Sequence, residues 1–320
     1  MSHRIVFFGS PDFAVESLEA IIEGGFDVPL VVTQPDRQSG RGKRLTPTPV
    51  KVFSEKKGIS VECISSFKDT DIVEKLNKLG PDFLVVVAFG LFLPDSVLKI
   101  ARKGNINLHA SLLPAYRGAS PINHAIVNGE QFTGVTTIEM VREMDAGPIY
   151  LQRVVPIEPF ESAGDLSKKL ASIGAELLVE TLVGIAEGKL EAKPQGEEGV
   201  SFAYKLKKSD GEIPWDKDAI GVHNHIRGMN PWPGSYSYFK GKYVKVHEAE
   251  PFSMMTVNSK PGTVVEVNSG GIFVACGRGV IRLKKVQFEG RKALYVSEFL
   301  KGYSVRAGEM FGSLKGNSNG

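Results

Sequence analysis

The chain has 320 residues, with 39 lysines and arginines against 36 aspartates and glutamates and a formal net charge of +3. Its 42% hydrophobic and 23% charged residues are typical of an ordinary soluble protein with room for two domains. The two cysteines, Cys63 and Cys276, lie far apart without partners at metal-ligand spacing, which argues against a disulfide framework and a zinc site. No stretch approaches the roughly 20 apolar residues of a membrane span, and the amino terminus does not resemble a signal peptide. We therefore expect a cytoplasmic protein that holds no metal.

Strands and helices are predicted to alternate in the first half of the chain. Residues 4–8 form a compact apolar strand, residues 13–22 an amphipathic helix, and residues 28–33 a second strand. Further helices are expected at residues 51–57, 69–79, 120–128 and 165–187, and further strands at residues 59–63, 83–88 and 134–140. This order predicts an α/β fold with a doubly wound, mostly parallel sheet. The first turn has no G-x-G-x-x-G motif, so a dinucleotide is not indicated.

Two polar side chains stand out in the run from Asn105 to Ile122, which has the sequence NINLHASLLPAYRGASPI. The run begins as a strand that must leave the sheet near Pro114, because proline cannot donate to a ladder. Alternation along the strand places Asn107 and His109 on the same face. Open α/β sheets bind ligands at the carboxyl ends of their strands. By themselves the two residues favour a satisfied core pair and a turn former at a strand end over a site.

A third group favours a catalytic site. Asp145 precedes Ala146, Gly147 and Pro148 in a loop that follows the strand expected at residues 134–140. A carboxylate beside His109 would orient the imidazole and favour its charged form. Together the three residues supply a hydrogen-bond donor for a developing oxyanion, a proton carrier and a group that tunes the carrier.

The connection at residues 34–51 is long and basic. A turn of this kind normally needs only a few residues, and long loops in compact domains are usually functional or disordered. Its composition fits a solvated surface loop or a contact to the phosphates of RNA. It has one acid, Asp36, and the following bases: Arg37, Arg41, Lys43, Arg44 and Lys51.

The second half of the chain predicts a separate β domain. Composition changes at residues 190–206, which we interpret as a linker between a domain at residues 1–189 and a domain at residues 207–320. After a helix expected at residues 219–227, short apolar runs are separated by turns at residues 240–242, 268–271 and 276–279, which is typical of a small barrel or sandwich. The bases that could form an electrostatic platform here are Lys240, Lys242, Lys245, Lys284, Lys285, Arg291 and Lys292.

The run from Asn107 to Ile122, followed by MDAGP at residues 144–148, resembles the signature of the folate-dependent formyltransferases without a departure. The GRGK core at residues 40–43 and the segment RGMNPWPG at residues 227–234 are similar to segments of the methionyl-tRNA formyltransferases. The resemblance covers nearly the whole chain. It implies a Rossmann-like formyltransferase domain followed by a β-barrel similar to an OB-fold.

The resemblance also implies roles for individual residues. Asn107, His109 and Asp145 correspond to the catalytic triad of the family. The segments corresponding to the folate site comprise Ser111, Leu112, Leu113 and Pro114, together with Phe89 and Gly90 beside the pteridine. The residues expected to contact tRNA are Arg37, Arg41, Lys43 and Arg44, with Arg41 as the discriminating one. No metal is implied, and a monomer is expected.

The implied reaction is transfer of the formyl group from 10-formyltetrahydrofolate to the amino group of initiator methionyl-tRNA, giving N-formylmethionyl-tRNA for translation initiation. A sugar-nucleotide formyltransferase would share the triad but should lack the arginine-rich insertion. A formylfolate hydrolase would need neither the insertion nor a second domain of this kind. A non-catalytic RNA-binding protein would explain the bases but not a complete triad.

Overall fold

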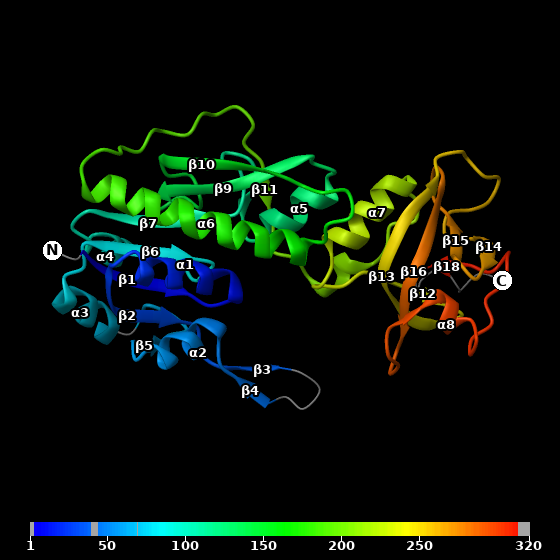
Figure 1. Ribbon diagram of the computed structural model, residues 1–320, viewed down its shortest axis with the longest axis horizontal. Coiled ribbons are helices and arrows are strands. Elements are labelled where there is room, and N and C mark those ends of the chain that lie inside the picture. Colours follow the sequence, from blue (N-terminus) through cyan, green and yellow to red (C-terminus); the bar gives the residue numbers. More distant parts are fainter. Residues whose placement is uncertain (1–2, 40–43, 69, 313–320) are drawn as a thin grey trace. The chain divides into compact units, whose positions relative to one another are not determined.

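The structure is a computed structural model that describes residues 3–39, 44–68 and 70–312 (Figure 1). The chain separates into two compact units. Unit 1 comprises Met1–Pro121, Phe132–Pro156 and Ser167–Tyr204, and unit 2 comprises Ile122–Gln131, Ile157–Leu166 and Lys205–Gly320. The last change of unit thus falls inside the segment interpreted as a linker. Two short segments from the first half of the chain cluster with unit 2.

Unit 1 is built on a seven-stranded sheet in the order β10-β9-β7-β6-β1-β2-β5. Its strands are β1 (Arg4–Gly9), β2 (Asp27–Thr33), β5 (Ser60–Cys63), β6 (Phe83–Val87), β7 (Gly104–His109), β9 (Phe132–Glu139) and β10 (Ile149–Pro156). All neighbours from β7 to β5 are parallel, whereas β9 is antiparallel to both β7 and β10. The chain starts in the middle of the sheet and moves first to one edge and then to the other, so the sheet is doubly wound as predicted.

Helices cover both faces of this sheet (Figure 1). They are α1 (Asp12–Glu23), α2 (Pro49–Lys56), α3 (Thr70–Leu79), α4 (Asp95–Leu98) and α6 (Ala163–Ala186), whereas α5 (Pro121–Val127) falls almost entirely in unit 2. Val6 and Phe8 of β1 belong to a core cluster that includes Ile72 and Leu76 of α3. On α6, a Cβ at Gly174 would lie 2.8 Å from a methyl carbon of Leu108, so this glycine allows α6 to pack closely on β7. Burial on both faces explains why the central strands are continuously apolar.

Two short pairs of strands complete unit 1. The basic connection forms a hairpin of β3 (Arg37–Ser39) and β4 (Arg44–Thr46), although no secondary structure is expected there from the sequence. Near the carboxyl end of β7, β8 (Arg117–Gly118) pairs with β11 (Phe202–Ala203) of the segment interpreted as a linker.

Unit 2 is a curled antiparallel sheet with one longer helix. Its elements are η1 (Lys208–Gly211), α7 (Ala219–Gly228), β12 (Tyr236–Phe239), β13 (Lys242–Ser253), β14 (Val264–Asn268), β15 (Gly271–Ala275), β16 (Val280–Phe288), β17 (Leu294–Tyr295), α8 (Val296–Phe299) and β18 (Phe311–Gly312). The sheet order is β14-β15-β16-β13-β12-β18, and a bridge between Thr263 and Met310 brings its two ends together. The small barrel is confirmed. Each turn predicted in this region joins two neighbouring strands.

The predicted elements of unit 1 correspond to observed ones, with ends that differ by a few residues. Besides the hairpin of β3 and β4, the elements of unit 1 that the sequence analysis does not include are α4, β8, β11 and the edge strand β10. Its residues alternate between partly buried and exposed positions at the edge of the sheet, with Val155 as its buried apolar residue. In the part of the chain that the structure describes, no helix is both long and apolar enough to cross a membrane.

Candidate active site

Strand β7 and the loop after β9 bring the three predicted catalytic residues together. The Nδ2 atom of Asn107 lies 3.4 Å from Oδ1 of Asp145, and Nδ1 of His109 lies 3.7 Å from Oδ2 of the same carboxylate. Asn107 and His109 therefore share one face of β7, as the alternation predicts. The His109 side chain is only 7% exposed and that of Asp145 is 16% exposed, so water screens their interaction weakly.

Backbone groups fix the orientation of the histidine and the carboxylate. The N–H of Gly118 donates to Oδ2 of Asp145 at 2.8 Å, and Nε2 of His109 lies 2.9 Å from the carbonyl oxygen of Tyr116. Each ring nitrogen of His109 thus faces an oxygen. The contact to Tyr116 is at hydrogen-bond distance, and the contact to Asp145 is longer.

The loop that carries Asp145 has an unusual backbone. Asp145 has φ of 51°, in the left-handed region that costs a residue other than glycine about 1 kcal/mol. Two positions later, a Cβ at Gly147 would lie 1.7 Å from the carbonyl oxygen of Glu139, so only glycine fits. The sequence pattern Asp-Ala-Gly-Pro therefore folds the loop back on the end of β9, which returns the carboxylate to β7.

The predicted folate segments follow the carboxyl ends of the adjacent strands β6 and β7. The hydroxyl of Ser111 donates to the carbonyl oxygen of Ala115 at 2.6 Å, and Leu113 is 3% exposed, so both side chains shape the loop from within. Leu112 and Pro114 are partly exposed.

Phe89 is 1% exposed and belongs to the core of unit 1, so its side chain packs inward. Gly90 has φ of 79°, and a Cβ there would lie 2.6 Å from the amide nitrogen of Gln34. A pteridine contact at this segment would therefore be made by Gly90 and by the backbone.

The predicted tRNA contacts are only partly described. Arg41 and Lys43 lie outside the residues that the structure describes. Arg37 and Arg44 are exposed, and the register pairs Arg37 with Thr46 and Ser39 with Arg44. Directly paired residues share a face of a hairpin, so both arginines lie on the same face. Lys51 forms an ion pair with Asp36 at 2.9 Å and is less available to a phosphate.

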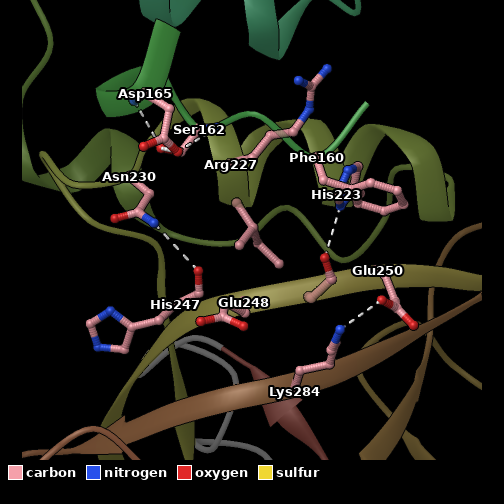
Figure 2. Close-up of a pocket in the computed structure, with 12 residues that line it drawn as sticks. Phe160, Ser162, Asp165, His223, Arg227, Asn230, His247, Glu248, Glu250 and Lys284 are labelled. Atoms are coloured by element: carbon pink, nitrogen blue, oxygen red, sulfur yellow. Dashed lines mark hydrogen bonds and ion pairs between the residues drawn. The ribbon is translucent and has the colours of Figure 1, made fainter. Parts of the chain in front are cut away.

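A cavity of about 480 Å³ lies within unit 2, between α7, β13 and the segment at residues 160–165 (Figure 2). Lys284 on its wall bonds Glu250 at 3.1 Å, and Arg227 donates to the carbonyl oxygens of Glu158 and Glu161 at 3.1 Å each. Both cations are thus bonded to groups of the same unit, and we assign the cavity no part in the reaction. Within the described residues, no group of three or more histidine, cysteine, aspartate or glutamate side chains could hold a metal ion.

The sequence analysis did not predict that three further residues contact His109 or the loop of Asp145: Tyr116, Gly118 and Gln195. The first two act through backbone atoms, which a sequence pattern does not reveal. Gln195 lies in the predicted linker, and its side chain reaches the loop of Asp145. Its only signal in the sequence is a polar residue beside Pro194.

The comparisons with known proteins decide the family. The formyl transferase family matches residues 3–182, and the formyl transferase C-terminal domain matches residues 205–304. The chain is 42% identical over 316 residues to the methionyl-tRNA formyltransferase of Desulforamulus reducens, covering 99% of this chain and 100% of that protein. It is 44% identical over 308 residues to the methionyl-tRNA formyltransferase of Geobacter metallireducens, covering 96% and 98%. The chain belongs to the methionyl-tRNA formyltransferase family. It is therefore an enzyme that transfers a formyl group.

Solved structures share the fold of this family at low sequence identity. An N-formyltransferase from Helicobacter canadensis, in complex with folinic acid and dTDP-3-aminofucose, has a TM-score of 0.66 at 19% identity, covering 88% of this chain and 99% of that one. HypX from Aquifex aeolicus in complex with tetrahydrofolic acid has a TM-score of 0.62 at 19% identity, covering 97% of this chain and 51% of that one. These likenesses confirm the Rossmann-like architecture with a small barrel domain.

Proposed function

We propose that the chain transfers the formyl group of 10-formyltetrahydrofolate to the amino group of initiator methionyl-tRNA, and that Asn107, His109 and Asp145 carry out this reaction. The observation that carries the proposal is the convergence of these three side chains within 3.7 Å at the end of β7. The products are N-formylmethionyl-tRNA, for translation initiation, and tetrahydrofolate. We place the reaction in the cytoplasm, with the chain acting as a monomer and without a metal.

The mechanism follows from the donors in the site. The neutral amine of the aminoacyl group attacks the formyl carbon and forms a tetrahedral oxyanion. Asn107 and protonated His109 donate hydrogen bonds to this oxygen. To do so, Nε2 of His109 gives up its contact with the carbonyl oxygen of Tyr116 and donates to the oxyanion instead. Removing one such donor typically lowers kcat by ~100-fold or more.

Asp145 orients His109 and helps a proton pass from the attacking nitrogen to the leaving nitrogen of the folate, through His109 or a water. The bond from the formyl carbon to the leaving nitrogen then breaks as the oxyanion collapses. The step needs no covalent enzyme intermediate. Catalytic contacts such as the one of 3.7 Å between His109 and Asp145 commonly shorten when substrate binds.

The folate donor binds between the segments Phe89–Gly90 and Ser111–Pro114. Because β6 and β7 are adjacent and parallel, both segments lie at the same edge of the sheet, beside the triad. The Helicobacter canadensis enzyme with folinic acid and HypX with tetrahydrofolic acid support a folate ligand for this fold.

The tRNA binds through the basic hairpin and the barrel. Arg37 and Arg44 on one face of the hairpin supply charge for phosphates near the acceptor end, and Arg41 and Lys43, which lie between them in the sequence, add to this charge. A guanidinium can also hydrogen-bond or stack on an unpaired base, which is why we assign discrimination to Arg41.

One experiment tests the function as a whole. The purified chain is given formylated folate with charged initiator tRNA, with free methionine, and with an amino sugar nucleotide. We expect formylation of the charged tRNA alone. Preferred formylation of the sugar nucleotide, or release of formate without an acceptor, would replace the proposal with one of the alternative reactions.

A further inference from the structure

The segment between α6 and residue 204 belongs to unit 1 and is attached there by backbone hydrogen bonds. Lys193 and Ile149 exchange backbone hydrogen bonds of 2.7 and 2.8 Å. Farther along, the carbonyl oxygen of Ser201 accepts from the N–H of Arg117 at 2.9 Å, and β11 pairs with β8. Gln195 lies between these two attachments, so its position is fixed from both sides.

The side chain of Gln195 joins two loops of the site. Its Nε2 atom donates to the carbonyl oxygens of Asp145 and Gly147, at 2.7 Å each. Its Oε1 atom accepts from Nε and Nη2 of Arg117, at 3.2 and 2.7 Å. All four hydrogen-bonding positions of the carboxamide are therefore used. The orientation of the amide is also determined, because a flipped amide would face donors toward donors and acceptors toward acceptors.

We propose that Gln195 is a positioning residue for the catalytic carboxylate. The inference rests on the proposed function of Asp145. The two N–H bonds hold the backbone of Asp145 and Gly147 where φ of Asp145 is unfavourable, and the N–H of Gly118 holds the carboxylate itself. Arg117, which donates to Gln195, directly precedes Gly118, which donates to the carboxylate of Asp145. Both residues form the short strand β8, so Gln195 also contacts the strand that holds the carboxylate.

The physical consequence concerns the distance from Asp145 to its two partners. The contacts of 3.4 Å to Asn107 and 3.7 Å to His109 are already long, so a small shift of the loop would break them. A misplacement of about 1 Å in a catalytic constellation can lower the rate by about a hundredfold. Gln195 thus acts on the reaction through Asp145, without touching a substrate.

The test is a double-mutant cycle with the full-length enzyme. Gln195→Ala should lower kcat by about ten- to a hundredfold and change KM for the formylated folate by less than about twofold. In an Asp145→Asn background, measured in single turnover with excess enzyme, Gln195→Ala should cost less than about threefold, because the group it positions is no longer a carboxylate. Glu198→Ala, at an exposed position of the same segment, is the matched control and should behave as wild type.

Gln195→Glu is the second variant, since it keeps the size of the side chain and the acceptors for Arg117 but loses both donors. It should lose as much turnover as Gln195→Ala. The inference would be overturned if Gln195→Ala lowered the rate by the same factor in the wild-type and Asp145→Asn backgrounds. It would also be overturned if Gln195→Ala left turnover unchanged, or if both Gln195 variants unfolded. Near-normal turnover of Asp145→Asn itself would instead refute the proposed role of Asp145, so the two failures are distinguishable.

Discussion

His109 ends strand β7 and Asp145 lies in the loop after β9, yet Nδ1 of His109 is 3.7 Å from Oδ2 of Asp145, and both side chains are largely buried. The same carboxylate oxygen accepts from the N–H of Gly118. A buried imidazole beside a fixed carboxylate is suited to acid–base chemistry.

His109→Ala should lower formyl transfer by about a thousandfold or more, because it removes both an oxyanion donor and the proton carrier. Thermal unfolding and folate binding should change little. The measurement is kcat with charged initiator tRNA, alongside calorimetry with a folate. His3→Ala, before the amino end of β1, is the control and should keep normal turnover. If the His109 variant simply unfolds, a core role for this histidine is favoured.

Ion pairs divide six of the seven bases proposed as a platform into two groups, and the seventh, Lys245, is partly buried. Lys240, Lys284 and Lys285 pair with Glu309, Glu250 and Glu248, respectively, and Lys242, Arg291 and Lys292 are exposed with no ion pair among those described. We expect the second group to provide the electrostatic contact to tRNA.

Replacing Lys242, Arg291 and Lys292 together by alanine should weaken tRNA binding and reduce the slope of log affinity against log salt by up to about 3. Replacing the three paired lysines is the matched control and should have a smaller effect. Filter binding at several salt concentrations measures both. Equal slopes for the two triple variants would argue against this division.

Arg41→Ala should impair formylation of initiator tRNA and reduce its advantage over elongator tRNA charged with the same methionine. The double variant Arg37→Ala/Arg44→Ala should lower formylation of both tRNAs by a similar factor, because phosphate contacts carry no sequence information. Folate binding should be unchanged in both variants. Equal losses on the two tRNAs for Arg41→Ala would make Arg41 a general phosphate contact.

Stability should fall at mildly acidic pH because of a buried histidine in α7. Burial lowers the pKa of His225 from 6.5 to about 4, and its Nε2 atom has no partner among the described residues. The folded pKa lies below the unfolded one, so the stabilising contribution is complete above pH 6.5 and is lost as pH falls toward 4. Its size is at most about 3 kcal/mol. Burial also lowers the pKa of His223, which adds to the same trend.

Urea unfolding at pH 7.5 and pH 5 measures this effect. His225→Asn should lose less stability between the two pH values than wild type, whereas His247→Asn, at a partly exposed position, should lose as much as wild type. An identical loss for His225→Asn and wild type would show that this histidine does not set the pH dependence.

The sequence alone determined the doubly wound sheet and the barrel, and it indicated the three residues that we propose to be catalytic. Apolar runs such as residues 83–87 and the turns between the barrel strands are local signals, and alternation along β7 is sufficient to place Asn107 beside His109. Similarity to the formyltransferases then connects these residues with Asp145, although they are distant in the chain. Edge strand β10 and the hairpin of β3 and β4 were missed, because short or exposed strands have little apolar pattern.

Only the tertiary structure decided which groups hold the catalytic residues in place. The N–H of Gly118 and the carbonyl oxygen of Tyr116 have no signature in a sequence, since every residue has a backbone. Gln195 lies in a segment whose composition indicates a linker, and its four hydrogen bonds form only because two attachments bring that segment onto the site. Long-range contacts of this kind depend on the packed chain and not on the local pattern.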